Sequence, residues 1–117
     1  MAEAGTHDTD RVIDEIRGER KRQGWDEGWS PPHDDAHRSG EMAGAAACYA
    51  MHGLVIHNDD LRSRAVAMTR DLWPWAASWW KPKNRRRDLV RAAALIVAEI
   101  ERIDRATVAR MAEKLTR

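Results

Sequence analysis

The feature that most constrains the fold is an apolar repeat in the last third of the chain. Its members follow one another at spacings of 4, 3, 4, 3 and 4 residues: Leu89, Ala93, Ile96, Ile100, Ile103 and Thr107. A repeat that averages 3.5 residues lies on one face of a long helix and is typical of helices that pair with another helix. Asn84 can cap this helix. If it continues to Leu115 it is about 45 Å long, so either residues 106–117 project or the helix packs against a second subunit.

Two earlier segments also have the apolar spacing of helices. The first begins near Glu41, with Ser39 as a candidate N-cap, and its apolar face holds Met42, Ala45, Ala46 and Tyr49. The second can be capped by Asn58 or Asp59, and its predicted stripe consists of Leu61, Ala65, Met68 and Leu72.

The amino-terminal part shows a thinner helical pattern. Asp8 or Thr9 can cap a helix that runs to about Gln23, with Gly24 as its stop. We expect residues 1–8 to be frayed. Residues 24–40 contain two consecutive prolines and read as an irregular connection.

These patterns predict an all-α fold of three to four helices in a single domain, residues 1–117, with a long C-terminal helix and assembly into a homo-oligomer. No segment alternates apolar and polar residues as a strand does.

No apolar run approaches the 18 residues of a membrane span, and the first residues lack a signal-peptide pattern. A single cysteine, Cys48, is compatible with a reducing compartment. We therefore expect a cytoplasmic protein that does not bind membranes. The net charge of +1 does not suggest bulk nucleic-acid binding.

The segment 73–87 is the strongest candidate binding site. It holds four of the six tryptophans of a chain that has no phenylalanine. Indole faces can stack on an aromatic ligand, and the basic residues that follow can hold phosphate. The ligand-binding candidates here are Trp73, Trp75, Trp79, Trp80, Lys81, Arg85, Arg86 and Arg87. The alternative is that the tryptophans fill the core and the basic residues are solvated, and we expect a division between the two.

A second candidate is the segment 33–37, which reads H-D-D-A-H. Its imidazoles and carboxylates suit a divalent metal ion, and they also suit general acid–base work or a polar structural loop. The metal candidates are His33, Asp34, Asp35, His37 and Glu19. If this segment shares a pocket with the tryptophans, then Trp29, His33 and His37 are further ligand-binding candidates.

A third pattern is Glu101-x-x-Asp104 on the last helix. It resembles half of the E-x-x-E…E-x-x-D magnesium motif of all-α nucleotide pyrophosphohydrolases. The other half is absent, because Glu15 and Glu19 are four residues apart rather than three.

Three motifs together resemble a family of small proteins that tailed phages and prophages encode. They are G-W…H-D-D-x-H in residues 28–37, G-E-M-A…A-C-Y-A in residues 40–50, and W-P-W…W-W-K-P…R-R-D-L-V in residues 73–90. The resemblance covers about residues 12–105, and residues 53–70 depart from the family pattern. It implies an accessory phage gene that acts on host metabolism or host defence.

The resulting function hypothesis is a binding protein that sequesters a nucleotide-derived ligand, such as a host immune signalling molecule. It assigns no catalytic residue and needs no cofactor. One alternative is a metal-dependent nucleotide hydrolase that uses the segment 33–37 and a divalent metal. Another is a protein–protein inhibitor of a host defence enzyme, with the tryptophans as contact residues.

Overall fold

The chain is described here by a computed structural model, which describes residues 2–26, 31–52, 54 and 57–117. These residues form five α-helices and one short 3₁₀ helix, and they contain no strand. The elements are α1 (Ala2–Asp26), α2 (Pro31–Asp35), α3 (Glu41–Met51), α4 (Asp59–Leu72), η1 (Ala77–Trp79) and α5 (Arg85–Leu115). The all-α prediction with a long C-terminal helix is confirmed, with one helix more than the three to four expected.

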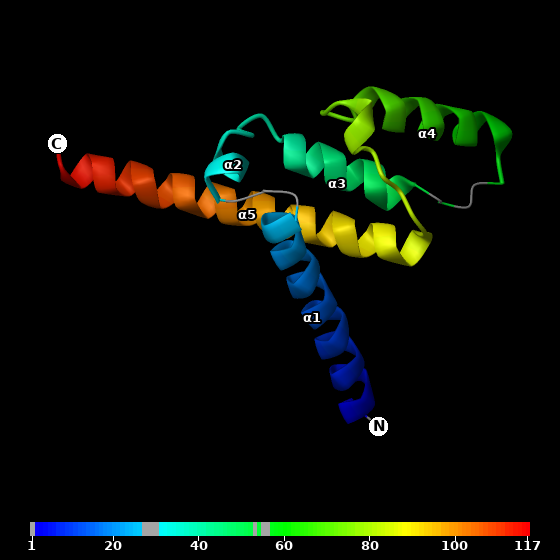
Figure 1. Cartoon of the computed structure of the whole chain (residues 1–117), viewed down its shortest axis with the longest axis horizontal. Helices are drawn as coiled ribbons and strands as arrows, with labels where there is room; N and C mark the ends of the chain where they lie inside the picture. The colour runs from blue at the N-terminus through cyan, green and yellow to red at the C-terminus, as the bar shows by residue number, and fades with distance from the viewer. Residues whose placement is uncertain (1, 27–30, 53, 55–56) are drawn as a thin grey trace.

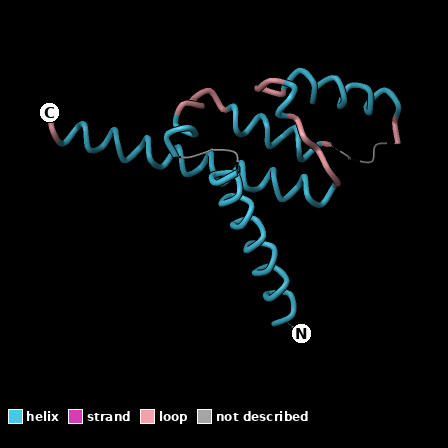
Figure 2. The backbone as a smooth tube through the Cα atoms, in the orientation of Figure 1, coloured by secondary structure: helices cyan, strands magenta, loops and turns pink. Residues whose placement is uncertain are grey.

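The long helix α5 is the element on which the others pack. Helix α3 lies along its first half, α4 lies on the far side of α3, and α1 crosses α5 steeply, as Figure 1 shows. The first half of α1 and the last part of α5 extend away from this body, and α5 remains helical as far as Leu115 (Figure 2). The molecule therefore has an open shape, with extents of 57 × 43 × 25 Å.

The core is small and lies between α3 and α5. The predicted face of α3 is confirmed as buried, and the buried cluster consists of Met42, Ala45, Ala46, Tyr49, Ala92, Leu95 and Ala98. Four of these seven residues are alanines, which lets the two helix backbones approach closely. Partly buried Trp73, Trp75 and Trp80 cover this cluster. They supply the bulk that phenylalanine would supply in another core.

Helix α1 differs from its prediction at both ends. It begins at Ala2 rather than near residue 9, and it continues through Gly24 to Asp26. The apolar stripe is thin because ion pairs, not apolar contacts, fix the second half of α1 to α5. Val12 and Ile13 remain exposed. The sequence pattern therefore underestimates this helix.

The connection from α1 to α3 is also more ordered than predicted. Pro31 and Pro32 form the first turn of α2, where the missing N–H groups carry no penalty. Ser39 does not cap α3. Gly40 is the N-cap residue with φ 81°, a conformation that favours glycine, and Glu41 reaches back to accept the Ser39 N–H at 2.6 Å.

Helix α4 has the predicted cap but not the predicted apolar face. The Asn58 side chain accepts the Leu61 N–H at 2.9 Å. Leu61, Met68 and Leu72 are all exposed, and α4 buries no residue completely. The predicted stripe is therefore wrong for Leu61, Met68 and Leu72. Of its members only Ala65 is half-buried, and the contact with α3 includes Thr69, whose carbonyl oxygen accepts the Cys48 S–H at 3.4 Å.

We expect Asn84→Ala to destabilise the protein by about 1 kcal/mol, the usual effect of removing an N-cap. The Asn84 side chain accepts the Arg87 N–H at 2.9 Å and starts the helix that carries the core. Urea unfolding at pH 7 measures the change. Asn58→Ala is the matched control, because it removes the same bond from α4, which buries no residue. A larger loss in Asn58→Ala than in Asn84→Ala would contradict the central place of α5.

Candidate functional site

A pocket of about 560 Å³ opens between the end of α3, helix α4 and the tryptophan segment. This volume is within the range of small-molecule binding sites. The walls are apolar and aromatic, with several polar side chains among them. The lining residues are Met51, His52, Leu54, Arg62, Ala65, Val66, Thr69, Arg70, Trp73, Ala77 and Trp80.

The two indoles of the pocket are held by other aromatic rings. Trp73 meets Trp80 with ring centroids 4.9 Å apart at 63°, and it meets Tyr49 edge-on at 5.7 Å. Edge-to-face pairs of this kind are favourable beyond the area that they bury. The Trp73 Nε1–H donates to the carbonyl oxygen of Ala76 at 3.1 Å. The aromatic wall is therefore in place before any ligand arrives.

His52 contributes a polar side chain to the pocket, and a buried carboxylate holds its ring in place. Its Nδ1 lies 3.1 Å from Oδ2 of Asp88, a carboxylate that is completely buried. The other carboxylate oxygen of Asp88 accepts the Lys83 N–H at 2.9 Å. A carboxylate partner of this kind orients an imidazole ring, and the ring of His52 also packs edge-on against Trp80 at 5.4 Å.

Helix α4 adds two cations to the pocket. Arg62 pairs with Asp59, and Arg70 lies 3.5 Å from the carboxylate of Asp71. These four side chains are largely exposed, so the pairs are weak and their guanidinium groups can turn to a better anion. Flat indole faces next to two guanidinium groups can hold a ligand that is both aromatic and negatively charged.

The structure separates the four tryptophans of the segment 73–87. Trp73 and Trp80 line the pocket and also pack against the core, so these two indoles serve both purposes. Trp75 packs on the core and lies beside His37, with ring centroids 5.3 Å apart. Trp79 is exposed, with Nζ of Lys81 at 5.3 Å from its ring centroid. Trp29 lies outside the described residues, so its predicted role stays a prediction.

The three arginines at the start of α5 are engaged in contacts within the chain. Arg85 donates to the carbonyl oxygens of Ala50 and His52 at the end of α3, where a cation is favourable. Arg86 makes two bonds to Glu15, at 2.6 and 2.7 Å. Their role in binding phosphate stays a prediction, and it would require these contacts to break.

Arg87 joins a buried ion pair that fixes α1 to α5. Glu19 accepts from Arg87 and, through both carboxylate oxygens, from Arg22 at 2.7 and 2.8 Å. Burial alone raises the pKa of Glu19, but the two guanidinium groups outweigh it and hold that pKa below its ordinary value. Glu19 is therefore an ionised anchor of the fold.

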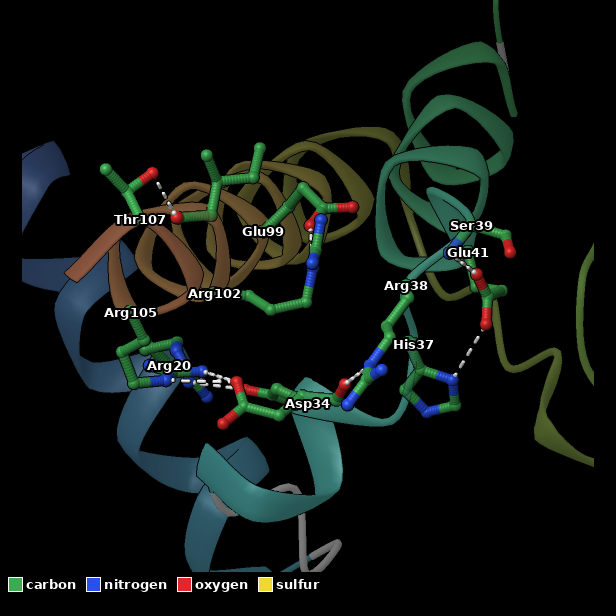
Figure 3. A network of polar contacts seen from close by, with 12 residues as sticks. Arg20, Asp34, His37, Arg38, Ser39, Glu41, Glu99, Arg102, Arg105 and Thr107 are labelled. Atoms are coloured by element: carbon green, nitrogen blue, oxygen red, sulfur yellow. Dashed lines mark hydrogen bonds and ion pairs between the residues drawn. The ribbon is translucent and has the colours of Figure 1, made fainter. Parts of the chain in front are cut away.

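The acidic residues of the 33–37 segment also pair with arginines. Asp34 lies 2.7 Å from Arg20 of α1, and Asp35 lies 2.8 Å from Arg105 of α5, so this segment joins the two long helices (Figure 3). Burial raises the pKa of Asp34 despite the adjacent guanidinium. Figure 3 also shows His37 directed at Glu41, 3.3 Å away.

Among the described residues, no group of three or more His, Cys, Asp or Glu side chains is arranged to hold a metal ion. The candidates His33, Asp34, Asp35, His37 and Glu19 are not gathered into one set. None of the pocket-lining residues comes from the segment 33–37. This pocket lies between the tryptophans and α4, and a pocket shared by the tryptophans and the segment 33–37 stays a prediction.

The sequence analysis did not identify His52, Arg62 and Arg70 as pocket residues. A pattern in the sequence could have indicated the two arginines, because Arg62, Val66 and Arg70 are spaced by four and lie on one face of α4. His52 had none, since its partner Asp88 is 36 positions away in the chain.

Comparison with known proteins gives no relative: no family model, no curated protein and no solved structure matches the chain. Within the described part of the chain, no helix combines the length and apolar character needed to cross a membrane.

Proposed function

We propose that this protein binds a small aromatic anion, of the nucleotide-derived class, in the pocket between α3, α4 and the tryptophan segment. The observation that carries the proposal is the pocket of about 560 Å³ that places the indoles of Trp73 and Trp80 together with Arg62 and Arg70. Under the proposal an aromatic base contacts the indoles. A phosphate or carboxylate group meets the guanidinium groups.

The combination of apolar, aromatic and cationic side chains in the pocket supports this ligand class. The indoles, Met51 and Val66 offer a surface to a ring, and stacking on a base contributes about 1–3 kcal/mol. A charge-assisted hydrogen bond from an arginine contributes about 1.5–3 kcal/mol. Binding in the micromolar range requires about 8 kcal/mol, which one stacking contact and one such bond do not reach. The proposal therefore uses both indoles and both arginines of the pocket. Sequestration of a host signalling nucleotide would follow from tight binding of one such compound.

Calorimetric titration of the full chain with nucleoside monophosphates, cyclic nucleotides and ADP-ribose tests the proposal. We expect at least one compound to bind at micromolar concentration. Arg62→Ala should then weaken that binding about 10-fold or more, the effect of losing one charge-assisted bond. Arg64→Ala is the matched control: Arg64 is on the same helix, pairs with Asp60 as Arg62 pairs with Asp59, and does not line the pocket.

Two results would contradict the proposal. One is the absence of heat with every compound at concentrations up to the millimolar range. The other is an equal loss of affinity in Arg62→Ala and Arg64→Ala, which would place the ligand outside the pocket.

A further inference from the structure

The heptad-spaced face of α5 has no partner within the described chain. Leu89, Ile96, Ile100 and Ile103 are between 41% and 53% exposed. The other faces of α5 pack against α1, α2 and α3. A 3.5-residue repeat is the pattern that two helices need to pack along their length. Its apolar members therefore match a second helix rather than water.

The solvent-accessible area of the chain is larger than that of a compact monomer, and the difference indicates how much surface a second copy could cover. The chain exposes 8263 Å², whereas a compact monomer of 13.4 kDa exposes about 6,500 Å². The excess of about 1,800 Å² per chain is within the range that stable homodimers bury on each subunit. The radius of gyration agrees, at 16.9 Å against about 13 Å for a compact chain of this length.

The two projecting helix ends carry opposite charge. On α1, residues 7–14 hold Asp8, Asp10 and Asp14 against Arg11, a net charge of −2. On α5, residues 106–117 hold three basic side chains against Glu113, a net charge of +2. All of these residues are exposed. Opposite charges on two different ends of one chain favour contact between the ends in a two-fold pair.

We propose that two copies of this chain pair through their α5 helices, antiparallel, about a two-fold axis that crosses between Ile96 and Ile100. In this arrangement Leu89 of one copy faces Thr107 of the other. The basic end of α5 in one copy then lies near the acidic half of α1 in the other copy. That half of α1 extends away from its own α5 near the Arg86–Glu15 pair. Two-fold pairing makes every such contact twice.

Sedimentation equilibrium of the full chain measures the assembly. Protein concentrations of about 1 to 100 µM are on the order of typical dimer dissociation constants. We expect a mass twice the 13.4 kDa of one chain. Ile100→Glu should raise the dissociation constant about 30-fold or more, as for a central interface residue. Met68→Glu is the matched control, because Met68 is 51% exposed on α4 and lies outside this face. A chain that stays monomeric, or an Ile100→Glu variant that dimerises as the unmodified chain does, would overturn the proposal.

A cysteine experiment tests the antiparallel arrangement even if Ile100→Glu disturbs folding. The double variant Leu89→Cys/Thr107→Cys should form a disulfide-linked dimer on mild oxidation, and neither single variant should. The native Cys48 is buried and should not compete. Cross-linking in Leu89→Cys alone would show parallel helices and contradict the arrangement.

Discussion

Glu19→Gln is expected to weaken the attachment of α1 to α5 and to lower the free energy of unfolding by about 2–3 kcal/mol. The substitution leaves Arg22 and Arg87 without their shared carboxylate, which is 3% exposed. Breaking a fully buried ion pair costs about 3–5 kcal/mol. The expected loss is smaller because both arginine side chains remain about a third exposed and keep some water.

The same ion pair also predicts how the free energy of unfolding changes with pH. Because the pKa of Glu19 is lowered by folding, its contribution is present above the ordinary carboxyl pKa and is lost as the pH falls through the folded value. The raised pKa of Asp34 acts in the opposite direction and offsets part of this loss on acidification. Glu19→Gln should therefore lose less stability between pH 7 and pH 3 than the unmodified chain.

Urea unfolding at both pH values, with hydrogen exchange of the α1 amides, measures these effects. Asp14→Asn is the control, because Asp14 is exposed on α1 and its ion pair is with Arg17, three residues further along the same helix. If Glu19→Gln changed stability no more than Asp14→Asn, then the buried ion pair of Glu19 would not stabilise the attachment of α1.

Leu95→Ala is expected to cost about 3–5 kcal/mol, the upper part of the range for a buried leucine. Leu95 is completely buried at the centre of a core whose other members are mostly alanines. The alanines around it are too small to fill the space that the leucine side chain leaves. A loss of this size is a large share of the stability of a domain of 117 residues.

Thermal unfolding followed by circular dichroism measures the effect, with Met68→Ala as the control on the exposed face of α4. We expect Met68→Ala to change stability by less than about 0.5 kcal/mol. A loss below about 1 kcal/mol in Leu95→Ala would contradict the assignment of the core to the α3–α5 contact.

The sequence predicts most strongly those helices whose contacts are apolar and periodic. The cap at Asn84 and the face of Met42 and Tyr49 are confirmed for this reason. Helix α1 is underestimated because ion pairs with residues about 70 positions away hold it, and such pairs leave no periodic signal. The stripe on α4 is wrong because Leu61 and Met68 do not face α3.

The candidate site could be predicted only in part for a similar reason. A cluster of tryptophans and arginines in one segment suggests a single site, yet backbone geometry sends the side chains to different partners. Arg85 and Arg86 turn to α3 and α1, while Trp73 and Trp80 face α4. The arginines that complete the pocket come from α4, a segment that the tryptophan pattern does not reach.

Two-dimensional NMR of the indole N–H groups tests the binding proposal most directly, because each tryptophan reports separately. Addition of the tightest compound from the nucleotide panel should shift the Trp73 and Trp80 signals, which line the pocket, and leave the exposed Trp79 signal in place. Saturating shifts at Trp73 and Trp80 alone are the result that we predict. A shift confined to Trp79, or no shift at any indole, would contradict binding in this pocket.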